Sequence, residues 1–154
     1  MMGVIGITKI RDIGSLVKFS HTIFAMPFAL ASMIVAARGF PTLRIFALIL
    51  IAMITARNAA MAFNRFIDAA IDAKNPRTTA RHIPQGIFSK NFVLVFSVVN
   101  AALLILVSYF LNPLCFRLSP PALFVLYLYS LTKRFTHYSH LVLGLALGMS
   151  PMAA

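Results

Sequence analysis

The chain has 154 residues, of which 60% are hydrophobic and 11% are charged, and its mean hydropathy is +0.90. A soluble domain usually carries about 25% charged residues, so this composition argues against a soluble fold and excludes intrinsic disorder. Fourteen Lys and Arg residues face three acidic ones, giving a formal net charge of +11. Because the basic residues separate long apolar segments, they indicate loops that flank membrane spans and exclude nucleic acid as the partner. The sequence predicts an all-α, polytopic transmembrane helix bundle.

Apolar segments recur along the chain at lengths that fit membrane-spanning helices, which need about 20 residues. A polar stretch between Asp72 and Lys90 contains Asn75-Pro76, Pro84 and Gly86, and this turn chemistry predicts a loop. Two adjacent prolines suit the start of the last complete span. The four predicted spans cover about residues 15–37, from 43 to beyond 62, 91–111 and 120–132.

A fifth apolar segment begins near His140 and continues to Ala154, the last residue of the chain. At about 1.5 Å per residue, this segment is too short for the roughly 30 Å hydrocarbon layer of a membrane. We therefore expect the chain to end inside a membrane helix. On this reading, residues 1–154 form the N-terminal half of a longer transmembrane domain, with about four complete spans and a truncated fifth.

The distribution of Lys and Arg among the loops predicts a cytoplasmic N-terminus, because cytoplasmic loops carry the excess of basic residues. With this orientation, ten basic residues lie on the cytoplasmic side and three on the opposite side. The cytoplasmic set is Lys9, Arg11, Lys18, Arg65, Lys74, Arg77, Arg81, Lys90, Lys133 and Arg134, and the opposite set is Arg38, Arg44 and Arg117.

Two of the three acidic residues lie near the end of the second predicted span. Asn64, Asp68 and Asp72 are spaced four residues apart, so they share one face of a helix, and Arg57 lies close to the same stripe. Polar groups in a span are costly and usually functional. Two carboxylates one helical turn apart repel each other, and a divalent cation removes that repulsion. Mg²⁺ commonly binds one or two carboxylates together with substrate phosphates.

This spacing supports two interpretations. In the first, the carboxylates bind Mg²⁺, and nearby basic side chains neutralise the phosphates of a bound diphosphate. Those side chains are Arg57, Arg65, Lys74, Arg77 and Arg81. In the second, Asp68 and Asp72 form ion pairs at the membrane interface with Arg65, Lys74 or Arg77.

Four segments of the chain extend this pattern. They are Lys18 to Phe28 in the first span, the N-x-x-x-D-x-x-x-D motif at residues 64–72, the loop at residues 75–86, and a Y-x-x-x-K-R signature within residues 129–136. In this order, the segments resemble the motifs of the UbiA-type intramembrane prenyltransferases. The resemblance is strongest to the 4-hydroxybenzoate polyprenyltransferases and their menaquinone-pathway relatives.

The resemblance implies a helix bundle around a central cavity, with two aspartate-rich motifs that bind Mg²⁺ on the diphosphate of a prenyl substrate. It implies that Asn64, Asp68 and Asp72 are the catalytic, metal-binding residues. It also implies substrate-binding roles for loop residues Arg77 and Arg81, and for Lys133 and Arg134, which positive-inside anchoring explains equally well. From its place in the span, Arg57 pairs with Asp68 or reaches the substrate.

The reaction that the resemblance implies is Mg²⁺-dependent transfer of a polyprenyl group from its diphosphate to an aromatic acid such as 4-hydroxybenzoate. It belongs to ubiquinone or menaquinone biosynthesis in the cytoplasmic (inner) membrane. No acidic residue follows Asp72, so the second motif is absent from the chain. The alternatives are an inactive remnant, a half that works only with a separately encoded C-terminal half, and a channel or transporter fragment.

Overall fold

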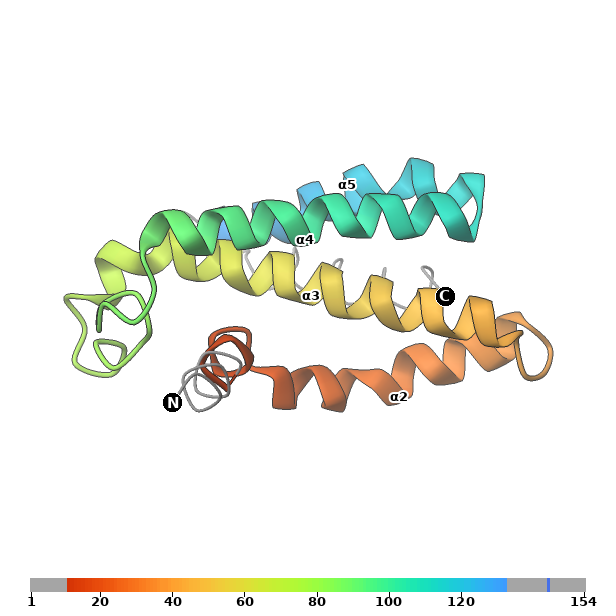
Figure 1. The fold of residues 1–154 in the computed structure, drawn as a ribbon, viewed down its shortest axis with the longest axis horizontal. Coiled ribbons are helices and arrows are strands. Elements are labelled where there is room, and N and C mark those ends of the chain that lie inside the picture. Colours follow the sequence, from red (N-terminus) through yellow and green to blue (C-terminus); the bar gives the residue numbers. More distant parts are fainter. Residues whose placement is uncertain (1–10, 133–143, 145–154) are drawn as a thin grey trace, which may run out of the picture.

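The computed structural model describes residues 11–132 and Gly144. Within this part all regular structure is helical, which confirms the all-α prediction. A short helical segment at residues 11–16 precedes four long helices. These are Phe19–Ala36 (α2), Leu43–Asp72 (α3), Lys90–Leu111 (α4) and Pro113–Thr132 (α5) (Figure 1). The predicted fifth span lies outside the described residues.

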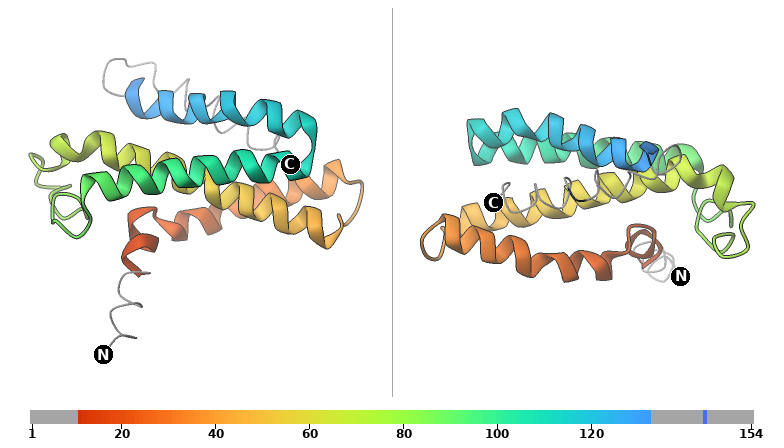
Figure 2. Two further views of the ribbon diagram at one scale, coloured as in Figure 1. Left: turned by 45° about the horizontal axis from the view of Figure 1, so that its top comes forward. Right: turned by 180° about the vertical axis from the view of Figure 1, so that it is seen from behind.

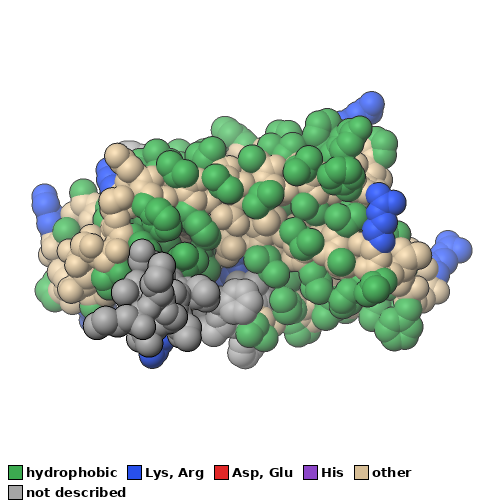
Figure 3. Space-filling model, in the orientation of Figure 1, with side chains coloured by type: hydrophobic (Ala, Val, Ile, Leu, Met, Phe, Trp, Pro, Cys, Tyr) green, Lys and Arg blue, Asp and Glu red, His purple; other side chains and the backbone are tan. Residues whose placement is uncertain are grey.

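Three of these helices, α3, α4 and α5, are long and apolar enough to cross a membrane. They pack against one another, and α4 turns an apolar stripe outward that includes Val95, Val99 and Leu106. Figure 3 shows hydrophobic side chains along the bundle and Lys and Arg mostly near its two ends. This arrangement fits lipid around the middle of the bundle and water at its ends. The predicted count of four complete spans and the cytoplasmic N-terminus stay predictions.

The first predicted span is divided in the structure. Lys18 has a left-handed backbone with a φ of 50°, and α2 begins only after it, at Phe19. Residues 11–16 form the separate short helical segment, so α2 is shorter than the 15–37 range that hydropathy predicts for the first span.

α3 is the longest helix and extends beyond what a membrane requires. Its 30 residues contain no Pro or Gly, and Thr42 caps its start by accepting a hydrogen bond from the Ile45 amide. At about 1.5 Å per residue the helix is roughly 45 Å long, against a hydrocarbon layer of about 30 Å. The helix is therefore longer than the hydrocarbon layer is thick, and its last turns carry the acidic residues.

α5 begins seven residues earlier than predicted, at Pro113 instead of Pro120. The side chain of Asn112 accepts a hydrogen bond of 2.7 Å from the Cys115 amide, and proline suits the first helical position, where its missing N–H is not needed. Pro120 lies inside the helix. It cannot donate to the Phe116 carbonyl, but the Ser119 hydroxyl donates to that oxygen at 2.9 Å instead.

Neutral hydrogen bonds join α3, α4 and α5 near the middle of the bundle. The Ser97 hydroxyl donates to the Ala59 carbonyl at 2.8 Å and lies 3.0 Å from the Tyr127 hydroxyl. Asn58 donates to the Asn100 side chain at 3.2 Å. We call Asn58, Ser97, Asn100 and Tyr127 the polar seam. Because Ala59 and Ala62 are small and fully buried, α3 approaches its neighbours closely enough for these contacts.

Candidate functional site

The candidate site is at the end of α3 where the helix meets the 73–89 loop. Asp68 and Asp72 retain only 8% and 4% of their surface accessible, although both are acidic. With Asn64 they occupy successive turns of α3, as their spacing predicts. Buried carboxylates need a counter-charge or several hydrogen bonds, so the surroundings of these two side chains define what the site can bind.

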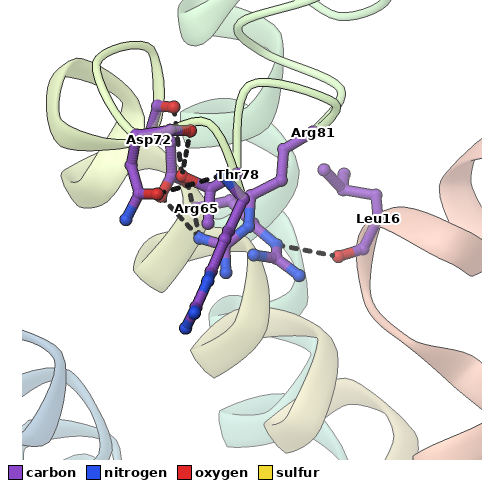
Figure 4. A network of polar contacts seen from close by, with 7 residues as sticks. Leu16, Arg65, Asp72, Thr78 and Arg81 are labelled. Carbon is purple, nitrogen blue, oxygen red and sulfur yellow. Dashed lines mark hydrogen bonds and ion pairs between the residues drawn. The ribbon is translucent and has the colours of Figure 1, made fainter.

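Arg81 supplies the counter-charge for Asp72. Its Nη1 atom lies 2.6 Å from Oδ1 and 2.7 Å from Oδ2 of the carboxylate. Figure 4 shows Arg81 reaching from the loop to the end of α3. The Thr78 hydroxyl also donates to the main-chain carbonyl of Asp72 at 3.0 Å. Of the partners expected from sequence proximity, Arg65 interacts electrostatically with Asp72. The loop folds back over the helix end and brings a further cation, Arg81, to the carboxylate.

Arg65 lies inside the helix and not in the loop where the sequence analysis counted it. The stretch from Arg65 to Asp72 contains no helix breaker, so α3 continues to Asp72 and buries Arg65 to 7% exposure. Its Nε donates to the Leu16 carbonyl at 3.5 Å, and it interacts electrostatically with Asp68, Asp72 and Arg81. Arg65 thus adds a fixed positive charge beneath the two carboxylates.

The N-terminal segment packs against this end of the bundle, a contact that the sequence analysis missed. Leu16 is fully buried against Ala62 and Val93, and Ser15 Oγ lies 2.6 Å from His82 Nε2. Figure 2 shows that this segment and the 73–89 loop lie at the same end of the molecule. Ser15 and His82 are 67 residues apart, and no local pattern in the sequence indicates their pairing.

His82 lies in the loop between α3 and α4, and its side chain contacts Ser15 of the N-terminal segment. Its ring stacks on Phe88 with 5.8 Å between ring centroids. Burial lowers the pKa of His82 below its ordinary value, with Asp12 opposing this shift and Arg65 adding to it. The neutral ring is therefore the form that this packing favours.

Arg57 lies near the middle of α3, away from the acidic end. It precedes Asp68 by 11 residues, which corresponds to about 16 Å along the helix axis. This separation is too large for the two side chains to pair on one helix. Among the described residues, no group accepts a hydrogen bond from the buried Nε of Arg57.

The structure brings only part of the predicted site together. Asn64, Asp68, Asp72 and Arg81 lie at one end of α3, and Arg77 is exposed in the adjoining loop. Lys133 and Arg134 lie outside the described residues. In the described part of the chain, no group of three or more His, Cys, Asp or Glu side chains gathers. Two carboxylates and an amide are nevertheless oxygen donors that suit Mg²⁺ when substrate phosphates complete its coordination.

The chain that carries this site is similar to a known protein family and to named relatives. Residues 25–154 match the UbiA prenyltransferase family. The chain is 33% identical over 144 residues to the 4-hydroxybenzoate octaprenyltransferase of Vibrio cholerae, covering 93% of this chain and 48% of that protein. It is 32% identical over 123 residues to the 4-hydroxybenzoate octaprenyltransferase of Vesicomyosocius okutanii, covering 80% of this chain and 45% of that protein. The chain thus spans about half the length of these relatives.

The chain is also similar in fold to a solved structure. The apo structure of a UbiA homolog from Aeropyrum pernix superimposes with a TM-score of 0.79 at 32% identity, covering 87% of this chain and 48% of the other. With three apolar helices and these relatives, the molecule is a multi-pass membrane protein. The chain belongs to the UbiA prenyltransferase family.

Proposed function

We propose that the chain supplies the first acidic motif of an intramembrane enzyme that transfers a polyprenyl group from its diphosphate to an aromatic acid such as 4-hydroxybenzoate. The observation that carries the proposal is the pair of buried carboxylates, Asp68 and Asp72, one turn apart beneath an arginine-bearing loop. The names of the relatives support the substrate classes. The product would enter ubiquinone or menaquinone biosynthesis at the cytoplasmic membrane.

Asn64, Asp68 and Asp72 are the proposed ligands of Mg²⁺, which when bound would stabilise negative charge on the leaving diphosphate. Arg81 and Arg77 extend from the loop that begins where α3 ends, so they are in position to neutralise diphosphate oxygens. Lys133 and Arg134 have the same proposed role, or bind the carboxylate of the aromatic acid.

Arg57 is the proposed binding residue for the aromatic acceptor. Seven residues, or about 10 Å along the axis of α3, separate it from Asn64. A carboxylate held at Arg57 would direct the aromatic ring toward the acidic end. There the allylic C–O bond breaks, the diphosphate leaves with the bonding electrons, and an electron-rich ring carbon attacks the allylic cation and gives up its ring proton to the released diphosphate. The apolar helix bundle keeps water away from the allylic cation. The buried Nε of Arg57, which has no hydrogen-bond partner among the described residues, supports this role.

No acidic residue follows Asp72, so the described motif is not accompanied in this chain by the second acidic motif that the family resemblance implies. We propose that it belongs either to a longer form of the same polypeptide or to a separately encoded C-terminal half. The relatives, which are about twice as long as this chain, support this division of the site. The N-terminus and the acidic end of α3 would both face the cytoplasm.

An assay on membranes tests the proposal. Membranes that contain the protein are incubated with labelled 4-hydroxybenzoate, a polyprenyl diphosphate and Mg²⁺, with and without a C-terminal half co-expressed. We expect a labelled lipid-soluble product that EDTA abolishes and Mg²⁺ restores. Product only after co-expression would establish the partner-dependent alternative. Failure to form product under both conditions would contradict prenyl transfer.

A further inference from the structure

Arg81 occupies both carboxylate oxygens of Asp72, which the proposed function assigns to the metal. We propose that Arg81 is an exchangeable counter-cation, which holds Asp72 while the site is empty and moves to the diphosphate when metal and substrate bind. Metal binding and diphosphate binding would then depend on each other. This inference rests on the proposed function, because it takes Asp68 and Asp72 to be the metal-binding residues.

The exposure of the two partners favours exchange. The side chain of Asp72 is 6% exposed, so without a cation its carboxylate would be a buried unpaired charge. The side chain of Arg81 is 32% exposed and extends from a loop. Asp72 therefore needs a cation beside it, whereas the Arg81 side chain is partly exposed and is not enclosed by the protein.

The loop can keep its fold when the Arg81 side chain leaves. Thr78 binds the main-chain oxygen of Asp72 and not its carboxylate. The Arg81 amide donates to the Thr78 carbonyl at 3.0 Å, and the Gln85 amide donates to the Arg81 carbonyl at 3.0 Å. These backbone contacts do not involve the guanidinium, so the exchange requires rotation of one side chain and not refolding of residues 73–89.

Arg65 supplies the reason why metal and diphosphate binding are coupled. This buried cation interacts electrostatically with Asp68, Asp72 and Arg81. A divalent metal that enters alone adds two positive charges beside Arg65 and Arg81, which opposes its binding. A diphosphate draws Arg81 away from Asp72, because its oxygens accept charge-assisted hydrogen bonds from a guanidinium. Each ligand therefore raises the affinity for the other.

The test measures the binding of Mn²⁺ alone, by electron paramagnetic resonance, and of inorganic pyrophosphate alone, by calorimetry, to the protein in detergent micelles. We expect Arg81→Gln to bind Mn²⁺ about tenfold more tightly and pyrophosphate about tenfold more weakly, since one charge-assisted hydrogen-bonded pair is lost. The opposite signs are decisive, because a distorted site would weaken both ligands. Arg44→Gln removes the same charge from an exposed position at the start of α3, the end of the helix away from the site, and is the matched control, with both affinities expected within about twofold of wild type.

Arg81→Lys covers the case in which Arg81→Gln fails to fold, because it keeps the charge but loses the planar guanidinium. It should shift both affinities in the same directions by a smaller factor. Unchanged Mn²⁺ affinity in the Arg81 variants, or weaker binding of both ligands, would overturn the exchange. Asp68→Asn and Asp72→Asn separate the two proposals. If neither reduces Mn²⁺ binding in the presence of pyrophosphate, the proposed function fails together with the exchange.

Discussion

At the middle of the bundle, the Ser97 hydroxyl of α4 donates to the Ala59 carbonyl of α3 at 2.8 Å and lies 3.0 Å from the Tyr127 hydroxyl of α5. At its loop end, Asp72 meets Arg81 through a charged contact of 2.6 Å. Both regions place polar groups in an apolar bundle, but the polar seam joins helix to helix, whereas the acidic end joins a helix to a loop. The bonds of the seam therefore fix the helices, and the charged contact is placed where a ligand can replace it.

The contrast between the two regions indicates which polar groups in such a bundle are structural. In lipid, two groups that share a neutral hydrogen bond between helices find no stronger partner that could replace it. A carboxylate that faces an arginine can exchange that partner for a metal ion, and the arginine can exchange the carboxylate for a phosphate. Substitutions in the two regions should accordingly affect different measurements.

The largest effect is expected at the acidic end. Asp68→Asn and Asp72→Asn keep the size of the side chains but remove the proposed metal ligands, so each should reduce prenyl transfer by at least about a hundredfold. The rate of product formation in membranes measures this effect. Ser97→Ala in the seam is the comparison and should retain most of the activity, while normal turnover in either Asp variant would contradict the assignment of the site.

Arg57 should give the next largest effect, and it should act on the acceptor alone. Arg57→Gln is expected to raise the KM for 4-hydroxybenzoate by about tenfold or more, because a carboxylate loses a charge-assisted partner. The KM for the prenyl diphosphate should stay close to wild type. A rise in the diphosphate KM instead would place Arg57 with the acidic end and not with the acceptor.

Loss of Arg81 should destabilise the metal-free protein. Arg81→Gln leaves the Asp72 carboxylate buried without its partner, and we expect a loss of about 1–2 kcal/mol in EDTA. Because the metal replaces the missing cation, Mg²⁺ with pyrophosphate should recover most of that loss. Thermal unfolding in detergent measures both quantities, and a loss that these ligands do not recover would mean that Arg81 is only structural.

A substitution in the polar seam should change the free energy of unfolding but not the affinity for ligands. Tyr127→Phe removes one hydroxyl and keeps the ring, which stacks on Phe63 with 4.2 Å between ring centroids. It should therefore lower the free energy of unfolding by about 0.6 kcal/mol. Its Mn²⁺ affinity should equal that of wild type. An altered Mn²⁺ affinity would show that the two regions are coupled and that the comparison fails.

The smallest effect is expected from His82. Because burial lowers its pKa in the folded protein, the folded state binds a proton less readily than the unfolded state does. The contribution of neutral His82 to the free energy of unfolding is therefore complete above its ordinary pKa of about 6.5, and it falls as the pH decreases below that value. Proteolysis of the N-terminal segment should increase slightly with acid, and His82→Asn should weaken this dependence. Equal pH dependence in both proteins would exclude His82 as its source.

The sequence predicted the helices well where composition alone determines them. A long apolar segment predicted α3, and the turn residues Asn75-Pro76 and Gly86 predicted the loop. It misplaced the start of α5, since Pro120 lies inside a helix whose freed carbonyl is bound by Ser119. The capping role of Asn112 was the signal that could have located that start.

The site was predictable only along one helix. Helical periodicity placed Asn64, Asp68 and Asp72 on one face, because residues four apart share a face in any α-helix. The contact of Arg81 with Asp72 depends on how the loop folds back, and that of Leu16 with Arg65 joins residues 49 apart. Such tertiary contacts have no local signal in the sequence.

We propose that the acidic end of α3, and not the polar seam, holds a divalent metal together with a diphosphate. Pulsed electron paramagnetic resonance on Mn²⁺ with added pyrophosphate detects this arrangement, because phosphorus nuclei bound to the metal give a characteristic coupling. We expect this coupling in the wild type and in Tyr127→Phe, and we expect it to be absent in the double variant Asp68→Asn with Asp72→Asn. Coupling that persists in the double variant would show that the metal and the diphosphate bind elsewhere.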